Sequence, residues 1–156
     1  MKAYQGTQVN YMKSQAKIGD ILARNRIYDK QFTHIGTEQK LILLFKKDVD
    51  WEGRKLPLGV KIEIDKVPSP ITDKERKECD RKHRVLFHWI KSKFEAINEG
   101  LYEDVMNGFI KEFYPNLLMG SKTIIEHTLP QFERAFLEGK TDVSLRLEDK
   151  RGNKNV

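Results

Sequence analysis

The spacing of hydrophobic residues changes along the chain, from alternation in the first half to a helical repeat in the second. Between residues 31 and 64, a short apolar run, "LILLF", is followed by alternation of apolar and polar residues at Val60, Ile62 and Ile64, and both patterns are typical of strands. Between residues 72 and 139 they recur three and four positions apart, which is typical of amphipathic helices. The pattern predicts an α+β protein with a small antiparallel sheet, one N-terminal helix, and a C-terminal helical cap of three or so helices.

The sheet is expected in the first part of the chain. Weak alternation in "AYQGTQVNYM" indicates a short N-terminal strand or arm, and Ser14 is placed to cap a helix that ends near Asn25. Further strands are expected from Gln31 to Ile35 and on both sides of the turn "DWEG", where Gly53 can adopt a positive φ. Pro57 has no N–H group for a sheet ladder, so its strand is expected to lie at an edge or to carry a bulge.

A long helix is predicted after the extended linker "VPSPIT". Thr72 and Glu75 form the capping-box pattern that starts a helix, and Gly100 is placed to end it after about Asn98. The first half of this helix is almost wholly polar, whereas the second half carries an apolar face. We therefore expect its C-terminal half to pack on the core and its N-terminal half to extend over the surface.

Two further helices are expected before a short final strand, and the segment "TIIEHTLPQFERAFLEGK" could also divide into two helices. The first ends at Pro115. The second starts at another capping-box pattern, formed by Thr128 and Gln131, with Pro130 in its first turn and Gly139 at its end. The stretch "DVSLRLED" alternates, which indicates the last strand.

The chain of 156 residues has the length of one domain. We expect a single α+β domain over residues 1–148, sheet-rich over 1–67 and helical over 72–139, followed by a flexible basic tail at 149–156. The sheet leaves at least one free edge, and the late helices carry many large apolar residues. Both features favour a homodimer or a higher homo-oligomer.

Composition restricts the kind of partner and compartment. The formal net charge of +6 favours anionic partners such as nucleic acid, nucleotides or an acidic protein face. No apolar run reaches the roughly 18 residues of a membrane-spanning helix, and the N-terminus lacks an apolar segment of the signal-peptide type. The single cysteine, Cys79, forms no internal disulfide, which favours a reducing compartment such as the cytoplasm.

The strongest candidate for a functional site is the basic first half of the long helix. Acidic residues alternate with its cations, so the segment is either a solvated helix that neutralises itself through ion pairs or a phosphate-binding surface. In the second case arginines would contact phosphates bidentately and lysines would supply positive field. An exposed tryptophan in the polar turn could stack on a base or anchor a partner, unless it packs in the core. The candidate ligand-binding residues are Arg76, Lys77, Arg81, Lys82, Arg84 and Trp51.

Several packing and capping residues of the second half form a recognisable pattern. They are Trp89, Glu95, Ala96 and Gly100 on the long helix, and Thr123 and Glu126 after a later turn. Through these residues the chain resembles a group of small uncharacterised bacteriophage proteins. The resemblance implies a phage or mobile-element origin, expression in the cytoplasm of a bacterial host, and a binding protein that blocks or sequesters a host factor.

The leading hypothesis is a non-enzymatic phage-type protein that sequesters an anionic host partner, either a signalling nucleotide or a defence protein, as a counter-defence device. The alternative is a nucleic-acid-binding accessory protein of phage replication or recombination, and a phosphodiesterase or nuclease is a minor alternative. The order helix, three strands, helix also invites comparison with double-stranded RNA-binding domains, although their "KKxAK" signature is absent. The sequence implies no cofactor, no metal and no membrane partner.

Three minor patterns bear on the enzymatic alternatives. His34 and His127 each lie near a threonine, as in two-histidine phosphoesterases, but the spacing differs from that motif. Cys79 and His83 lie four residues apart, yet a structural zinc site needs four ligands. The E-x-K pattern of Glu148–Lys150 is that of some nucleases, but it falls in the expected tail rather than on a rigid strand pair.

Overall fold

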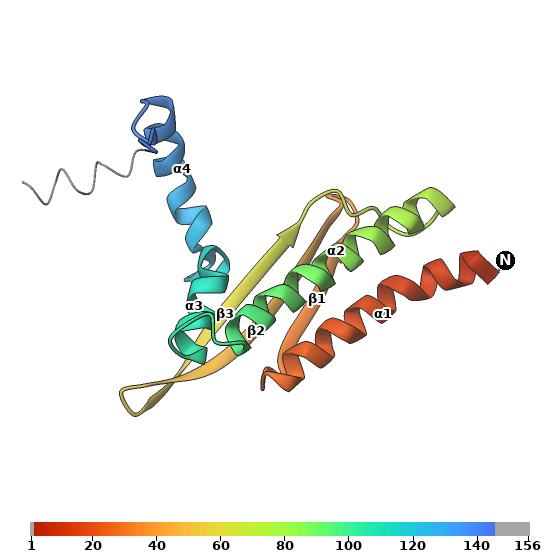
Figure 1. Ribbon diagram of the computed structural model, residues 1–156. Coiled ribbons are helices and arrows are strands. Elements are labelled where there is room, and N and C mark those ends of the chain that lie inside the picture. Colours follow the sequence, from red (N-terminus) through yellow and green to blue (C-terminus); the bar gives the residue numbers. More distant parts are fainter. Residues whose placement is uncertain (1, 146–156) are drawn as a thin grey trace, which may run out of the picture. The chain divides into compact units, whose positions relative to one another are not determined.

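The computed structural model describes the backbone of residues 2–145 and the side chains of residues 10–145 (Figure 1). The chain divides into two compact units, with the boundary between Ile124 and Ile125, and each unit is described by itself. The predicted α+β class is confirmed. Its elements are α1 (Lys2–Arg24), β1 (Asp29–Ile35), β2 (Lys40–Trp51), β3 (Arg54–Ile64), α2 (Asp73–Asn98), α3 (Val105–Phe113), a 3₁₀ turn (Tyr114–Asn116), β4 (Leu118–Met119), β5 (Lys122–Thr123) and α4 (Ile124–Leu137).

The three long strands form an antiparallel sheet in the order β1-β2-β3. The strand predicted near residue 31 is confirmed as β1, and Gly53 has the positive φ of 79° that the tight turn between β2 and β3 requires. Pro57 pairs with Asp48 on β3, which is an edge strand of this sheet. The edge position predicted for the proline is therefore confirmed.

Both long helices pack on the same face of the sheet (Figure 1). Alternate residues of β2, such as Leu41 and Leu43, are buried against the apolar sides of α1 and α2. The two helices run parallel, because early residues of α1 contact early residues of α2 and late residues contact late ones. The contacts that set this register are Tyr11 with Asp80, Gln15 with His83, and Asn25 with Asn98.

The start and end of α2 agree with the prediction. The Thr72 side chain accepts from the Glu75 N–H, and the Glu75 carboxylate accepts from the Thr72 N–H, so the capping box is complete. Gly100, with a φ of 79°, follows the last turn. The N-terminal half of α2 differs from the prediction, because it buries Cys79, Asp80 and other residues beneath α1 instead of only covering the surface.

The predicted N-terminal strand is wrong, because these residues belong to α1. The helical spacing of Ile18 and Leu22 continues backward through Ser14 and Tyr11, whose ring lies against His83. Ser14 is therefore buried in the helix interior and does not cap it. Burial against α2 outweighs the weak alternation that indicated a strand.

The last helix also begins earlier than predicted. α4 starts at Ile124, so Thr128 does not cap it and Pro130 lies inside the helix. Gly139 has a φ of 75° and follows the C-terminus of α4, as predicted. Residues 142–145 form no strand, while the rest of the predicted strand and the tail at 149–156 lie outside the described residues. Within the described residues, no helix combines the length and apolar character needed to span a membrane.

Candidate functional site

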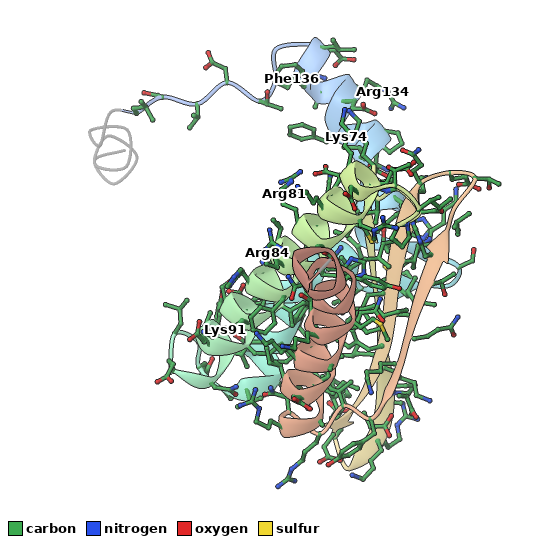
Figure 2. The ribbon with its side chains drawn as sticks, turned by 90° about the vertical axis from the view of Figure 1, so that its right-hand side faces the viewer. Lys74, Arg81, Arg84, Lys91, Arg134 and Phe136 are labelled. Atoms are coloured by element: carbon green, nitrogen blue, oxygen red, sulfur yellow. The ribbon has the colours of Figure 1, made fainter. Side chains whose placement is uncertain are left out.

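A row of exposed cations follows the outer side of α2. Lys74, Lys77, Arg81, Arg84 and Lys91 are all exposed, and their spacings of three, four, three and seven residues keep them on one side of a helix. Figure 2 shows Lys74, Arg81, Arg84 and Lys91 following one another along α2. At 1.5 Å per residue the row extends over about 25 Å.

The neighbouring helix α1 adds a second set of cations. Lys13, Lys17 and Arg24 are exposed, and the Lys17 ammonium lies 5.4 Å from the centre of the Phe87 ring on α2. Their spacing of four and seven residues keeps these cations on one side of α1. We use the name basic groove for the surface between the parallel helices, with its cations Lys13, Lys17, Arg24, Lys74, Lys77, Arg81, Arg84 and Lys91.

The surface is hollowed at two places along the two helices. The larger hollow, of about 880 Å³, is lined by Asn10 of α1 and by residues of α2 that include Lys77 and Arg84. The smaller hollow, of about 320 Å³, lies further along, between Arg24 of α1 and Lys91 of α2. Both hollows are open to solvent, and most of the side chains that line them are charged or polar.

Three of the predicted cations, Arg76, Lys82 and Arg81, form hydrogen bonds with neighbouring groups. The guanidinium group of Arg76 is buried and donates to the main-chain carbonyls of Pro70 and Ile71 and to the carboxylate of Asp73. Because it holds the linker against the start of α2, Arg76 is left out of the candidate site. The Lys82 ammonium donates to the main-chain carbonyl of Asp65 at 2.9 Å, so it fastens α2 to the end of β3.

Arg81 is exposed but paired. Its Nε and Nη2 donate to the two carboxylate oxygens of Glu78 at 2.8 and 2.9 Å. This bidentate pair lowers the pKa of Glu78 and raises that of Arg81. Lys77 and Arg84, by contrast, make no hydrogen bond or close ion pair with any described residue. These two predicted residues can therefore meet an external anion directly.

Trp51 is exposed at the turn between β2 and β3, with 49% of its surface accessible. The other end of this hairpin lies beside the N-terminal half of α2, because the Lys82 ammonium donates to the carbonyl of Asp65, just after β3. Trp51 therefore lies about 35 Å along β2 from that end. The structure does not bring Trp51 together with the cations in the first half of α2.

A buried carboxylate lies beneath the larger hollow. Asp80 is 1% exposed, its Oδ1 accepts from the N–H of Tyr11 at 3.0 Å, and its Oδ2 has no hydrogen-bond partner. Burial raises the pKa of Asp80, while the Tyr11 hydrogen bond and the nearby charge of Arg84 act in the opposite direction. Asp80 thus fixes α1 against α2 and leaves one carboxylate oxygen unsatisfied at the wall of the hollow.

His83 occupies a buried structural position. Its Nδ1 donates to the Cys79 carbonyl at 2.8 Å, and its Nε2 accepts from the Gln15 side-chain amide at 3.0 Å. Burial lowers the pKa of His83 and raises the pKa of the Cys79 thiol to about 11. The thiol is protonated at neutral pH, which removes it as a nucleophile. Among the described residues no three His, Cys, Asp or Glu side chains are grouped to hold a metal.

The residues of the enzymatic alternatives are placed separately. His34, on β1, hydrogen-bonds through Nε2 to the Val67 carbonyl at 2.7 Å. His127 lies on α4, in the second unit. Glu148–Lys150 lies outside the described residues. The two histidines therefore belong to different units, and the His34 side chain is hydrogen-bonded to the linker that precedes α2.

The raised pKa of Asp80 predicts a pH-dependent effect of Asp80→Asn. The folded protein holds the proton of the Asp80 carboxyl group more tightly than the unfolded chain does. Protonation of Asp80 therefore stabilises the fold fully below a pH of about 3.9, and this stabilisation is lost as the pH rises through the raised pKa. Asp80→Asn is expected to have a higher Tm than the native protein at pH 7, with the difference disappearing below about pH 4. Thermal unfolding followed by circular dichroism between pH 3 and 8 measures this difference.

Asp80→Ala provides the control for that measurement, because it also removes the acceptor of the Tyr11 N–H. It is expected to lower the Tm at both ends of the pH range. An Asp80→Asn protein that is less stable than the native protein at pH 7 would show that the carboxylate is stabilising in its charged form.

Comparison with known proteins identifies no matching family model, no similar curated protein and no similar solved structure.

Proposed function

We propose that the protein binds nucleic acid through the phosphate backbone, along the basic groove, and acts as a binding protein rather than an enzyme. The single observation that carries this proposal is the row of exposed cations on α2, of which Lys77 and Arg84 make no hydrogen bond or close ion pair with a described residue. Cations arranged in this way release counterions when they neutralise successive phosphates, which is the main source of affinity in backbone-directed binding.

The length of the row favours a polymer over a single nucleotide. A span of about 25 Å, at 1.5 Å per residue, is long enough to meet several successive phosphates. One continuous helix of 26 residues carries the row, which suits the regular backbone of a double helix. Binding of a single strand commonly uses exposed aromatic side chains as stacking platforms, whereas the Phe87 ring in the basic groove is half-buried and lies beneath the Lys17 ammonium.

Duplex RNA is the favoured form of nucleic acid. The first unit begins with the order helix, three antiparallel strands, helix, with both helices on one face of the sheet and a basic start to α2. Domains that recognise double-stranded RNA use the same order of elements and contact mainly phosphates and ribose hydroxyls. The chain departs from them in lacking their lysine signature and in the 26-residue length of α2.

Sequestration of a signalling nucleotide is the second candidate, and it is the form that a counter-defence protein of phage origin would take. The larger hollow favours it, because Lys77 and Arg84 line the hollow together with Asp80. The two exposed cations would bind the phosphate groups of the nucleotide.

A salt titration separates the two candidates. Fluorescence anisotropy is measured with a labelled 24-base-pair RNA duplex, the same duplex in DNA, its single strands, and a labelled cyclic dinucleotide. We expect the duplexes to bind, with log K falling linearly against log[salt] at a slope of about −4 to −5, as neutralisation of five phosphates requires. Between 50 and 200 mM salt, the loss of affinity is expected to be roughly 10²–10³-fold.

The competing outcomes are distinct. Stoichiometric binding of the cyclic dinucleotide, with no binding of the duplexes, would establish the second candidate and refute the first. Duplex affinity that does not change with salt would also refute backbone-directed binding.

A further inference from the structure

The helix α4 carries an apolar seam that none of the described residues of the second unit buries. Ile125, Leu129, Phe132 and Phe136 are 44, 43, 56 and 62% exposed, and no residue of α4 is buried. The rings of Phe132 and Phe136 stack on each other, with centroids 6.3 Å apart. An amphipathic helix of a folded protein normally buries such a face.

The spacing of the seam identifies the kind of surface that fits it. Steps of four, three and four residues are those of the a and d positions of a heptad, which form the narrow seam between two paired helices. A helix packed on a sheet or a globular core usually carries a wider apolar face than this. The expected occupant is therefore another helix with a matching narrow seam.

We propose that α4 pairs with α4 of a second copy of this chain, seam against seam. Among the described residues, none of the helices α1, α2 and α3 presents four exposed apolar side chains at this spacing, so a matching seam is offered by α4 itself. Because every copy of the chain carries the same seam, two copies can pair about a two-fold axis through this one surface.

The intrinsic stability of α4 gives a second, independent reason for pairing. α4 has 14 residues and contains Pro130, which removes one main-chain hydrogen bond from the helix. Isolated helices shorter than about 12–15 residues are marginal in water even with favourable sequences. Burial of the seam between two copies supplies the tertiary contacts that stabilise such a short helix.

The size of the seam sets the strength of the dimer. An aromatic side chain buries about 150–250 Å² when it is covered. Because these two phenylalanines and two aliphatic residues are already about half covered, two copies would bury on the order of 800 Å² in total, which is below the usual size of a specific interface. The pairing is therefore reversible, with monomer and dimer both present at micromolar concentrations.

Sedimentation velocity of the full chain between 1 and 200 μM tests the proposal. We expect the average mass to rise from one toward two copies with concentration. Phe132→Glu combined with Phe136→Glu is expected to remain monomeric throughout. Phe132→Leu combined with Phe136→Leu keeps the seam apolar and is expected to dimerise.

A matched control introduces the same two charges elsewhere. Ile71 and Leu101, in the first unit, are 72 and 69% exposed, and their replacement by glutamate is expected to leave dimerisation unchanged. Circular dichroism checks that each variant is folded. Either a native chain that is monomeric at 200 μM, or a glutamate seam variant that dimerises like the native chain, refutes the pairing of α4.

Discussion

Phe113→Ala is expected to lower the free energy of unfolding by about 3–5 kcal/mol, because it opens a cavity in the centre of the first unit. Phe113 is fully buried. Its ring centre lies 5.4 Å from that of Phe94 on α2, 5.6 Å from that of Phe45 on β2 and 5.1 Å from that of Phe109 on α3. One side chain thus joins three elements, and its neighbours cannot all relax into the space that it leaves.

Urea denaturation followed by tryptophan fluorescence measures this loss, since the Trp89 ring centre lies 5.9 Å from that of Phe113. Tyr114→Ala is a suitable control, because it removes an adjacent aromatic side chain that is 53% exposed. This change is expected to cost less than about 1 kcal/mol. Equal costs for the two variants would show that the aromatic cluster does not form the core.

Reversing three charges of the basic groove is expected to reduce the affinity for duplex RNA more than 100-fold at 100 mM salt. The variant combines Lys77→Glu, Arg84→Glu and Lys91→Glu. Each change removes the release of about one counterion and places a negative charge against the phosphates, so the slope of log K against log[salt] is also expected to fall by about 3. Fluorescence anisotropy with the RNA duplex measures both quantities.

The control for overall charge reverses Lys46, Arg54 and Lys55 on the sheet. These side chains are exposed, and the change in net charge is the same. The control is expected to lose no more than a few-fold in affinity, because only the long-range field is altered. If both triple variants lose affinity equally, the general charge of the protein carries the binding and the groove does not.

Short sequence motifs correctly predicted those features of the fold that depend on residues close together in the chain. The capping box at Thr72 and the glycine turn at Gly53 depend on hydrogen bonds and φ values within four residues, and both were correct. The start of α1 was missed because it depends on α2, which is distant in sequence: Tyr11 and Ser14 are helical and buried against a partner that the local pattern does not reveal. The sequence predicted Pro130 in the first turn of a helix, because proline lacks the N–H group that an interior position uses. The helix α4 nevertheless begins before Pro130 and continues through it.

The candidate site was predicted in part for the same reason. Counting cations along α2 identified Lys77 and Arg84, but it could not separate them from Arg76, whose partners are the carbonyls of the preceding linker. The candidate residues predicted from the sequence include none of the cations of α1. The spacing of Lys13, Lys17 and Arg24 on one side of a helix was the signal that could have indicated them.

The parallel arrangement of α1 and α2 has a consequence for how an anion approaches. Peptide dipoles add along each helix and leave about half a positive charge at its N-terminus. Since both helices begin at the same end, the two partial charges reinforce each other there. Asp73 and Glu75 offset the contribution of α2, but the first turn of α1 contains no acidic residue. Incoming polyanions should therefore be oriented with their first contact near Lys74, and the association rate should fall with ionic strength faster than the dissociation rate rises.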